Sequence, residues 1–339
     1  MLFFKRFYAI LKARNLEYFR DKASLSWSLL FPVLLLVGFA VVFSGDGKSL
    51  YKVGMLNAPD SETLFMQTKY VEFVEYKNTE MALGKLRQHK LDLLMDFRLQ
   101  LYWLNDTSPN GYIVEKLLLS QQEQNDHWKK QTVTGKQIRY LDWVLPGILG
   151  MNMMFSCLFG VGYVIVRYRK NMVLKRLNAT PVTAFEFLTA QIVSRMFIVM
   201  VISSAIFIGC NFIFDFYMLG SYRDLFIIAC LGALSLISLG LFIASRSQSE
   251  ELTGGLLNLA TWPMMVLSGV WFSLEGSPEL VQQIAWLLPL THLVEGARSI
   301  MTEGASLFEI REHIIILAIM TVVFLGIGTL SFRWDGDGR

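Results

Sequence analysis

Long apolar runs separated by polar stretches dominate the chain and indicate its architecture. A helix of about 20 apolar residues is long enough to cross a bilayer. Runs of that kind occur at 25–43, 143–166, 189–213, 224–245, 254–274 and 312–332. The pattern predicts a mainly α, polytopic membrane protein with six transmembrane helices, the last five of them within 143–332.

The first 24 residues carry a different pattern from the spans. Phe3, Phe7, Ile10 and Leu11 fall on one side of a helical projection, and most of the basic residues fall on the other. This is typical of an amphipathic helix that lies in the membrane surface. We therefore predict an interfacial helix over 1–24, and a basic tail that only sets the topology is the alternative.

The long polar segment 45–140 has the size of a small domain. Its pattern predicts strands at 52–57, 71–76, 91–97 and 99–106, and helices at 79–90 and 112–131. Strand–helix–strand order indicates a small α/β domain.

Lysine and arginine near the spans predict the orientation, because cytoplasmic loops carry the excess of these residues. Basic residues crowd the stretch before the first span and the loop after the second span, whereas the short segments on the other side hold only Arg223, Arg298 and Arg311. Both termini, including the tail 333–339, are therefore expected in the cytoplasm. The domain 45–140 is then expected outside it.

Composition narrows the class further. The chain is 53% hydrophobic and 17% charged with a net charge of +3, which fits a membrane protein and gives no reason to expect a nucleic-acid partner. Its three cysteines lie in apolar runs, so we expect no disulfide framework. The charged first 24 residues do not resemble a cleavable signal peptide.

Candidate chemistry is sparse. The segment GDGKS at 45–49 ends like a phosphate-binding loop, but Val42 stands where that motif needs glycine, so no nucleotide site is expected and ATP would have to bind another chain. His89 and His127 have no partners at metal-ligand spacing. Arg195 is the only charge inside a span away from the span ends, and we expect it to snorkel toward the inner surface.

The loop 167–188 is dense in charge. A short helix is predicted within it, with an apolar side formed by Met172, Leu174 and Leu177, and with Lys175 and Arg176 beside that side. Two interpretations remain open, a lever gripped by a motor subunit and a basic anchor that only fixes topology.

The end of this loop carries helix signals of its own. Thr180 precedes Pro181, and a residue before proline avoids helical geometry, so the short helix should end there. Thr183 is followed three residues later by Glu186, as in a capping box that begins the next helix.

The stretch 275–303 is amphipathic and is broken at Pro289. Its halves are too short to span a bilayer, which predicts a re-entrant helical hairpin on the outer side. Glu295 and Arg298 are spaced to pair on one helix face, which His292 shares. We interpret these three as satisfied polar groups of a packed hairpin, with a chemical role as the alternative.

Two segments carry a resemblance to a known family. KRLNATPVTAFEFLTAQI at 175–192 and SGVWFSLEGSPELVQQIAWLLPLTHLVEGAR at 268–298 are similar to the permease subunits of type-2 ABC exporters. The resemblance covers essentially the whole chain and points to the subgroup with a large extracytoplasmic domain after the first span. One departure is that residues 168–171 are Tyr-Arg-Lys-Asn, where the family often has Glu-Arg-Glu.

The resemblance implies partners and roles. It implies a transport subunit of the bacterial inner membrane that is no enzyme by itself, a second permease copy or paralogue, two separate ABC ATPase subunits that bind ATP and magnesium, and a periplasmic adaptor as an optional partner. Contact with the ATPase would involve Met172, Leu174, Lys175, Arg176, Leu177, Thr180, Pro181 and Glu186. An outer gate would comprise Pro289, His292, Glu295 and Arg298. The substrate path would include Phe31, Met151, Met154, Asn258, Trp262 and Met265.

Export of a hydrophobic or amphipathic molecule is thus the leading function. A membrane enzyme or an ion-coupled carrier would need acids, histidines or lysines deep within the spans, and away from the span ends Arg195 is the only such group. A sensor or assembly scaffold that uses the 45–140 domain without transport remains the alternative.

Overall fold

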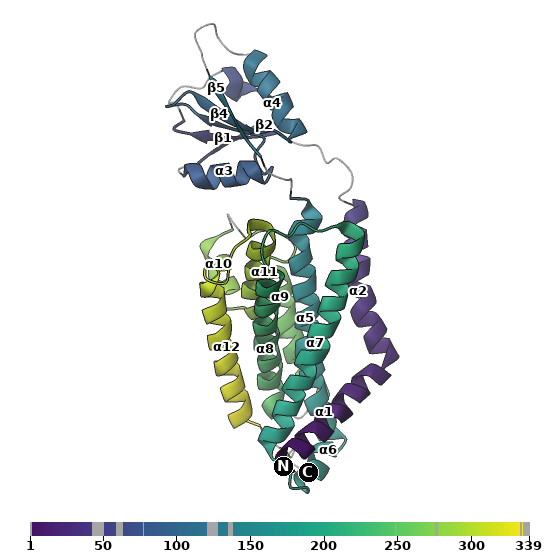
Figure 1. The fold of residues 1–339 in the computed structure, drawn as a ribbon. Coiled ribbons are helices and arrows are strands. Elements are labelled where there is room, and N and C mark those ends of the chain that lie inside the picture. Colours follow the sequence, from purple (N-terminus) through teal and green to yellow (C-terminus); the bar gives the residue numbers. More distant parts are fainter. Residues whose placement is uncertain are drawn as a thin grey trace. The chain divides into compact units, whose positions relative to one another are not determined.

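The computed structural model describes residues 2–42, 51–58, 64–76, 78–120, 128–134, 138–247, 249–274, 277–332 and 334. The prediction of a mainly α protein is confirmed (Figure 1). The chain divides into two compact units, one of Met1–Val42 with Tyr140–Arg339 and one of Phe43–Arg139. The GDGKS segment and His127 lie outside the described residues.

The first unit is helical. Its elements are α1 (Leu2–Arg20), α2 (Lys22–Val42), α5 (Tyr140–Lys170), α6 (Val173–Asn178), α7 (Ala184–Phe214), α8 (Tyr222–Arg246), α9 (Glu250–Leu267), α10 (Glu279–Trp286), α11 (Pro289–Arg298), the π-helical turn η2 (Ser299–Glu303) and α12 (Arg311–Leu330).

Four of these helices, α5, α7, α8 and α12, are long and apolar enough to cross a membrane. A fifth crossing is counted if α1 and α2, which bend by 62° where they meet, form one broken span. Six crossings therefore stay a prediction. They require α2 and α9 each to span the membrane.

The prediction for the fifth apolar run is wrong at its end. We expected the span to reach residue 274, but α9 ends at Leu267. The N–H of Ser268 still bonds to the carbonyl of Met264, and Gly269 then adopts a φ of +66°. A left-handed residue just after a helix ends it, and glycine takes that conformation without a steric penalty.

Helix α5 lies at the centre of this unit. It packs against α2, α7, α8, α9 and α11, and α8 in turn packs against α7, α11 and α12 (Figure 1). The shared core includes Met151, Met154 and Leu158 of α5. A Cβ at Gly240 of α8 would lie only 3.1 Å from the Leu158 Cα, so the absent side chain lets these two helices cross closely.

The second unit is a five-stranded mixed sheet with helices. Its elements are β1 (Tyr51–Leu56), η1 (Leu64–Gln67), β2 (Val71–Glu75), α3 (Thr79–Arg87), β3 (Leu93–Asp96), β4 (Leu101–Asn105), α4 (Pro109–Ser120) and β5 (Lys129–Val133). The strand order is β2-β1-β3-β4-β5, and only the β3–β4 pair is antiparallel. The predicted small α/β domain is confirmed as a fold.

Alternation along the strands places the two helices on opposite faces of this sheet. Leu93 and Met95 of β3 pack in one cluster with Val114 of α4. Leu94, between them, packs in the other cluster with Leu86 of α3. Successive side chains of a strand point to opposite faces, so each helix covers one face.

The predicted helix over 112–131 is wrong at its C-terminal part. Helix α4 ends at Ser120, and Lys129–Val133 form the edge strand β5, parallel to β4. Trp103 Nε1 donates to Gln131 Oε1 at 2.5 Å, and the Trp128 ring meets the Phe97 ring edge to face. Pairing with a distant strand decided this segment, and local pattern does not report such pairing.

We predict that Gly147→Ala destabilises the protein. A Cβ at Gly147 of α5 would lie 2.6 Å from the carbonyl oxygen of Val270, and that backbone atom has little freedom to move. The variant should lower the midpoint of thermal unfolding of detergent-purified protein by several degrees, measured by tryptophan fluorescence.

The matched control is Gly209→Ala in α7, where an added Cβ meets nothing within 4 Å. Alanine is favoured over glycine in helices by about 1 kcal/mol, so the control should be neutral or slightly stabilising. Equal midpoints for the two variants would contradict the close packing at Gly147.

Candidate functional site

The short helix predicted in the 167–188 loop is confirmed as α6. Met172, in the left-handed conformation with φ 58°, separates it from α5. Leu174 is fully buried in the core, whereas Lys175 and Arg176 are exposed. Helix α6 therefore has one apolar side on the bundle and a basic side facing outward. The predicted apolar side is only partly right, because Met172 is exposed.

The break after α6 and the start of α7 also follow the prediction. Helix α6 ends at Asn178, and Thr180 Oγ1 donates to the Leu177 carbonyl at 2.6 Å. Thr183 and Glu186 form a complete capping box, in which the Thr183 N–H donates to Glu186 Oε2 at 2.7 Å. The Glu186 side chain is buried, so it stabilises the turn and offers little surface to a partner.

Helix α1 packs along α7 and contacts this loop directly. Arg6 donates to the Pro181 carbonyl and lies 3.7 Å from the Glu186 carboxylate. Farther along, Ser194 Oγ donates to Asn15 Oδ1 at 2.5 Å. The described C-terminal end is also here, because Trp334 packs against Phe187. Both described ends of the chain lie at the end of the bundle that holds α6 (Figure 1).

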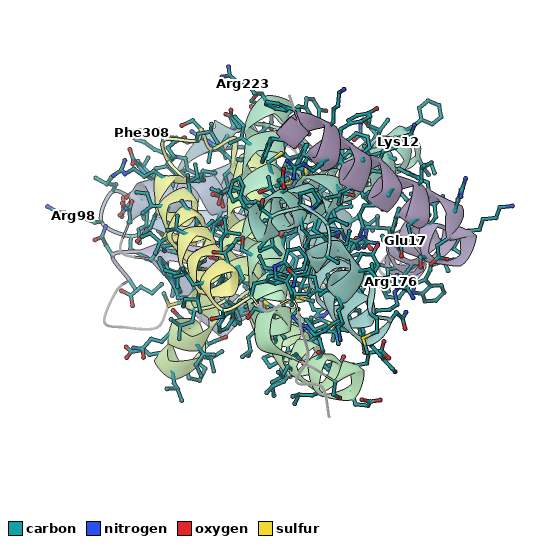
Figure 2. All side chains as sticks on the ribbon, turned by 90° about the horizontal axis from the view of Figure 1, so that it is seen from below. Lys12, Glu17, Arg98, Arg176, Arg223 and Phe308 are labelled. Carbon is teal, nitrogen blue, oxygen red and sulfur yellow. The ribbon has the colours of Figure 1, made fainter. Side chains whose placement is uncertain are left out.

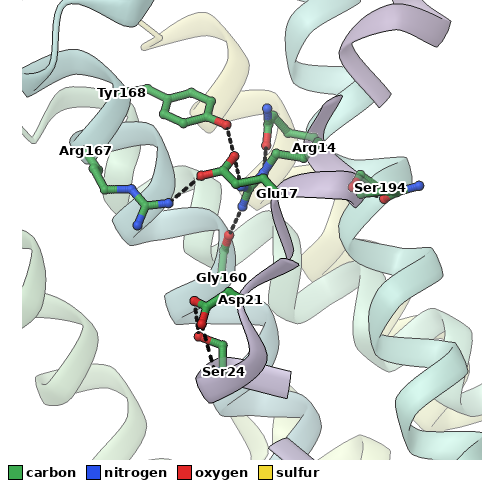
Figure 3. A network of polar contacts seen from close by, with 10 residues as sticks. Arg14, Glu17, Asp21, Ser24, Gly160, Arg167, Tyr168 and Ser194 are labelled. Atoms are coloured by element: carbon green, nitrogen blue, oxygen red, sulfur yellow. Dashed lines mark hydrogen bonds and ion pairs between the residues drawn. The ribbon is translucent and has the colours of Figure 1, made fainter. Parts of the chain in front are cut away.

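A buried arginine of α1 joins three helices. Arg14 Nε donates to Gln191 of α7 at 2.8 Å, and its Nη2 donates to the Gly160 carbonyl of α5 at 3.2 Å (Figure 3). Its Nη1 donates to Glu17, one helical turn away, at 2.8 Å. A buried guanidinium is costly unless its donors are satisfied, and here each nitrogen has an acceptor.

Glu17 extends this cluster to the C-terminal end of α5. Arg167 Nη2 donates to Glu17 at 2.7 Å, and the Tyr168 hydroxyl donates to its other oxygen (Figure 3). Seen from the end of the bundle that holds α6, Lys12, Glu17 and Arg176 lie on the same side of the view (Figure 2).

The next two residues connect α5 to two further helices. Arg169 is buried and donates to the carbonyls of Ala244, Ser245 and Ser247 at the C-terminal end of α8. A cation there is favoured by the unpaired carbonyls and by the helix dipole. Lys170 Nζ pairs with Glu250 at the start of α9 at 2.8 Å. The residues that depart from the family pattern therefore form contacts within this chain.

Our expectation that Arg195 snorkels is wrong. The residue is buried, its Nε donates to the Ser156 carbonyl at 2.6 Å, and its guanidinium lies 5.3 Å from the Tyr18 ring centroid. A Cβ at Gly160 would overlap the Arg195 guanidinium. Because Gly160 has no side chain, the Arg195 guanidinium fits beside α5. The Ser156 carbonyl accepts its hydrogen bond there, so the side chain does not need to extend to water.

At the opposite end of the bundle, the two predicted short helices are confirmed as α10 and α11, with Pro289 in the first turn of α11. His292 is fully buried, with Nδ1 3.0 Å from His313 Nδ1 and Nε2 2.8 Å from the Trp286 carbonyl. Sequence analysis missed His313, because it lies in the last span, 21 residues away. Whether the hairpin is re-entrant stays a prediction.

Arg298 ties this hairpin to the rest of the bundle. Its Nε donates to the Trp143 carbonyl of α5 at 3.1 Å, and its Nη2 donates to the Gly269 carbonyl at 2.7 Å. The guanidinium also stacks on the Trp143 ring at 3.8 Å. Glu295 lines a small cavity of about 120 Å³ with Thr291 and Trp286, and its pairing with Arg298 stays a prediction.

The six residues expected on a substrate path are not brought together on one surface. Met151 and Met154 are buried in the core, whereas Asn258 and Trp262 are exposed on α9. Phe31 and Met265 are half-buried against the core.

A row of aromatic rings on α5 was missed. Phe155, Phe159 and Tyr163 follow one another at four-residue spacing, with ring centroids 5.9 and 5.6 Å apart. Their common face is half-buried to exposed. The four-residue spacing is the signal that could have found this row in the sequence.

Among the described residues, no three histidine, cysteine, aspartate or glutamate side chains are grouped in a way that would hold a metal ion. The most organised polar chemistry of the helical unit is therefore the set of contacts around α6 and the ends of α1 and α5.

Comparison with known proteins identifies the family. The family model described as "ABC-2 family transporter protein" matches residues 22–330. The chain is 22% identical over 370 residues to the probable multidrug ABC transporter permease YbhS of Escherichia coli K12, and the match covers 98% of each chain.

Two further relatives match over about half of the chain. The inner membrane transport permease YhhJ of Escherichia coli K12 is 27% identical over 173 residues, covering 51% of this chain and 46% of the relative. The linearmycin resistance permease protein LnrN of Bacillus subtilis is 23% identical over 186 residues, covering 54% and 48%. With its apolar helices and a family match over most of its length, the chain belongs to the ABC-2 family of transporter proteins.

Proposed function

We propose that this chain is the membrane-spanning subunit of an exporter, driven by separate ABC ATPase subunits that push on α6. The observation that carries the proposal is the placement of α6. Its exposed Lys175 and Arg176 face outward, and its buried Leu174 contacts the core of the bundle. A partner that moves this helix moves the core directly.

The contacts behind α6 support a mechanical role. Directly before α6, the end of α5 is joined to α1 through Tyr168, to α8 through Arg169 and to α9 through Lys170. Charge-assisted hydrogen bonds of this kind resist sliding. A displacement of α6 is therefore distributed over several helices at once, as switching between discrete packed arrangements requires.

ATP and magnesium are assigned to the partner ATPase subunits, two copies per transporter. In the coupling of ATP hydrolysis to export, this chain is proposed to contribute only α6, the helix on which the ATPase subunits push. Of the residues expected to contact the ATPase, Met172, Lys175, Arg176, Thr180 and Pro181 are exposed and suit that role. Leu174, Leu177 and Glu186 support the helix from behind.

The proposed topology has six crossings, with α6 and both termini in the cytoplasm of a bacterial inner membrane. The excess of lysine and arginine around α6 and in α1 supports this orientation. The sheet unit and the α10–α11 hairpin would then lie on the outer side, where His292 and Arg298 hold the hairpin closed.

Substrate and direction are proposals as well. The relatives YbhS and LnrN are named for multidrug transport and linearmycin resistance. We assign this chain a hydrophobic or amphipathic substrate, exported along the face of α5 that carries Phe155, Phe159 and Tyr163. Aromatic rings give such a path apolar contact area without charge. A second copy or a paralogue would close the path, with Phe31, Asn258 and Trp262 facing it.

We predict that Lys175→Glu with Arg176→Glu uncouples ATP hydrolysis from export. Reversing two exposed charges on α6 should abolish docking of the ATPase while leaving the bundle core intact. Co-purification of the ATPase and export of a hydrophobic dye from cells should both fall at least tenfold.

The control for this pair is Lys69→Glu with Lys90→Glu, two exposed lysines of the sheet unit. It should leave both readouts unchanged. Unchanged export in the α6 variant would refute the coupling role, and export without any co-purifying ATPase would refute an ATP-driven function.

We predict that Glu17→Gln and Tyr168→Phe act as one unit. Because Glu17 is partly exposed, the coupling between the two changes should be about 1 kcal/mol. A double-mutant cycle on the unfolding free energy should show that energy, and each single variant should weaken substrate-stimulated ATPase activity. Tyr112→Phe, an exposed tyrosine of α4 in the sheet unit, is the control, and full additivity of the two changes would argue against the cluster.

We predict that Phe159→Ala lowers dye export about fivefold or more without loss of folded protein. Phe159 lies in the middle of the aromatic row, so its removal interrupts the path. Phe324→Ala in α12, also a half-buried ring in a stacked pair, is the control for lost packing. Equal effects of the two variants would remove the support for a path along α5.

A further inference from the structure

A cavity of about 460 Å³ lies among α5, α7, α8 and α11, on the helical unit alone. Its floor is formed by buried side chains of α5 and α11, among them Met153, Leu293 and Ala297. No charged residue lines it. The volume falls in the range of about 300–1,000 Å³ that is usual for small-molecule sites.

The mouth of this cavity opens between α7 and α8. Ile208 of α7 and Phe226 of α8 line the cavity and are also exposed, with 67% and 52% of their surfaces accessible. Both helices are long and apolar enough to span a membrane. As membrane spans, the two helices would be surrounded by bilayer hydrocarbon at this level, and the cavity would open to it.

The polar groups of the lining are few and uncharged. Ser203 and Ser204 lie partway along α7, and Asn211 and Tyr222 lie where α7 ends and α8 begins. The cavity is thus apolar along its length and has amide and phenol groups at one end. That end is the one away from α6, near the level expected for the ester groups of lipids.

We propose that this cavity binds one acyl chain of a membrane phospholipid, which enters sideways between α7 and α8. The hydrocarbon chain fills the apolar part against Met153 and Leu293, and its ester end meets Asn211 and Tyr222. The apolar part of the cavity does not hold ordered water, which needs several polar partners. The proposal rests on α7 and α8 being membrane spans and does not depend on export.

An occupied cavity has a structural consequence. The acyl chain contacts α7 and α8 on one side and α5 and α11 on the other, so it joins the outer halves of helices that Arg298 already links in part through α5 and α11. Its removal should loosen the bundle at this end.

The test uses the full-length protein in nanodiscs of phosphatidylcholine that carry a photoactivatable diazirine near the end of one acyl chain. After illumination, mass spectrometry locates the attached lipid. We expect attachment to concentrate on cavity residues of α5 and α11, which ordinary boundary lipid does not reach. Ser204→Phe, which places a ring inside the cavity, should reduce that attachment at least tenfold.

Ala205→Phe is the matched control. It adds the same ring to the next residue of α7, which is exposed and does not line the cavity. It should leave attachment at α5 and α11 unchanged. Ala229→Phe in α8 fills the cavity from the other side and replaces Ser204→Phe if that variant does not fold.

Three results would overturn the proposal. One is attachment confined to exposed residues of α7, α8 and α12 with none at the cavity floor. Another is equal attachment at the floor in Ser204→Phe and Ala205→Phe. The third is efficient disulfide formation between two copies of Ile208→Cys in the same nanodiscs, which would show a second copy of the chain covering the mouth.

Discussion

Among the described residues of the helical unit, four arginines bond to main-chain carbonyls of a neighbouring helix, and the packing of the helices depends on them. Arg14 of α1 and Arg195 of α7 donate to carbonyls in the middle part of α5, and Arg298 of α11 donates to a carbonyl near its start. Arg169 of α5 donates to the end of α8. A helix carbonyl keeps a second lone pair after its own helical bond. In a chain this apolar, the lone pair is an acceptor that can satisfy a buried guanidinium.

This arrangement holds α5 at several points along its length against the helices that pack around it. Its end leads into α6 with only two residues between the helices, Asn171 and the left-handed Met172. A force on α6 therefore reaches α1, α8 and α9 through side chains that are already bonded, without a loop that absorbs it. The opposite end of α5 is held by Arg298 at the α10–α11 hairpin, so one helix connects the two ends of the unit.

The two sides of the bundle differ in what they offer. On one, the half-buried rings of α5 and the exposed face of α9 give an extended apolar surface suited to a second copy and a moving substrate. On another, residues of α7 and α8 line the apolar cavity that we propose for a bound lipid chain. Both surfaces depend mainly on shape and apolar area for specificity, which is weaker than hydrogen-bond recognition and tolerates chemically varied molecules.

The sequence by itself determined the helical class, the limits of most helices, the α/β unit and the loop with its short helix and capping box, since these follow from periodicity and local side-chain bonds such as that of Thr183 with Glu186. Only the tertiary structure decided what pairs across distance. The structure decided strand β5, the partner of His292, the burial of Arg195 and the cluster around Glu17. Contacts of this kind join residues far apart in the sequence, such as Arg167 with Glu17, 150 positions apart, and Arg14 with Gln191, 177 positions apart. No local pattern encodes such contacts, because their free energy arises only when the packed helices bring the groups together out of water.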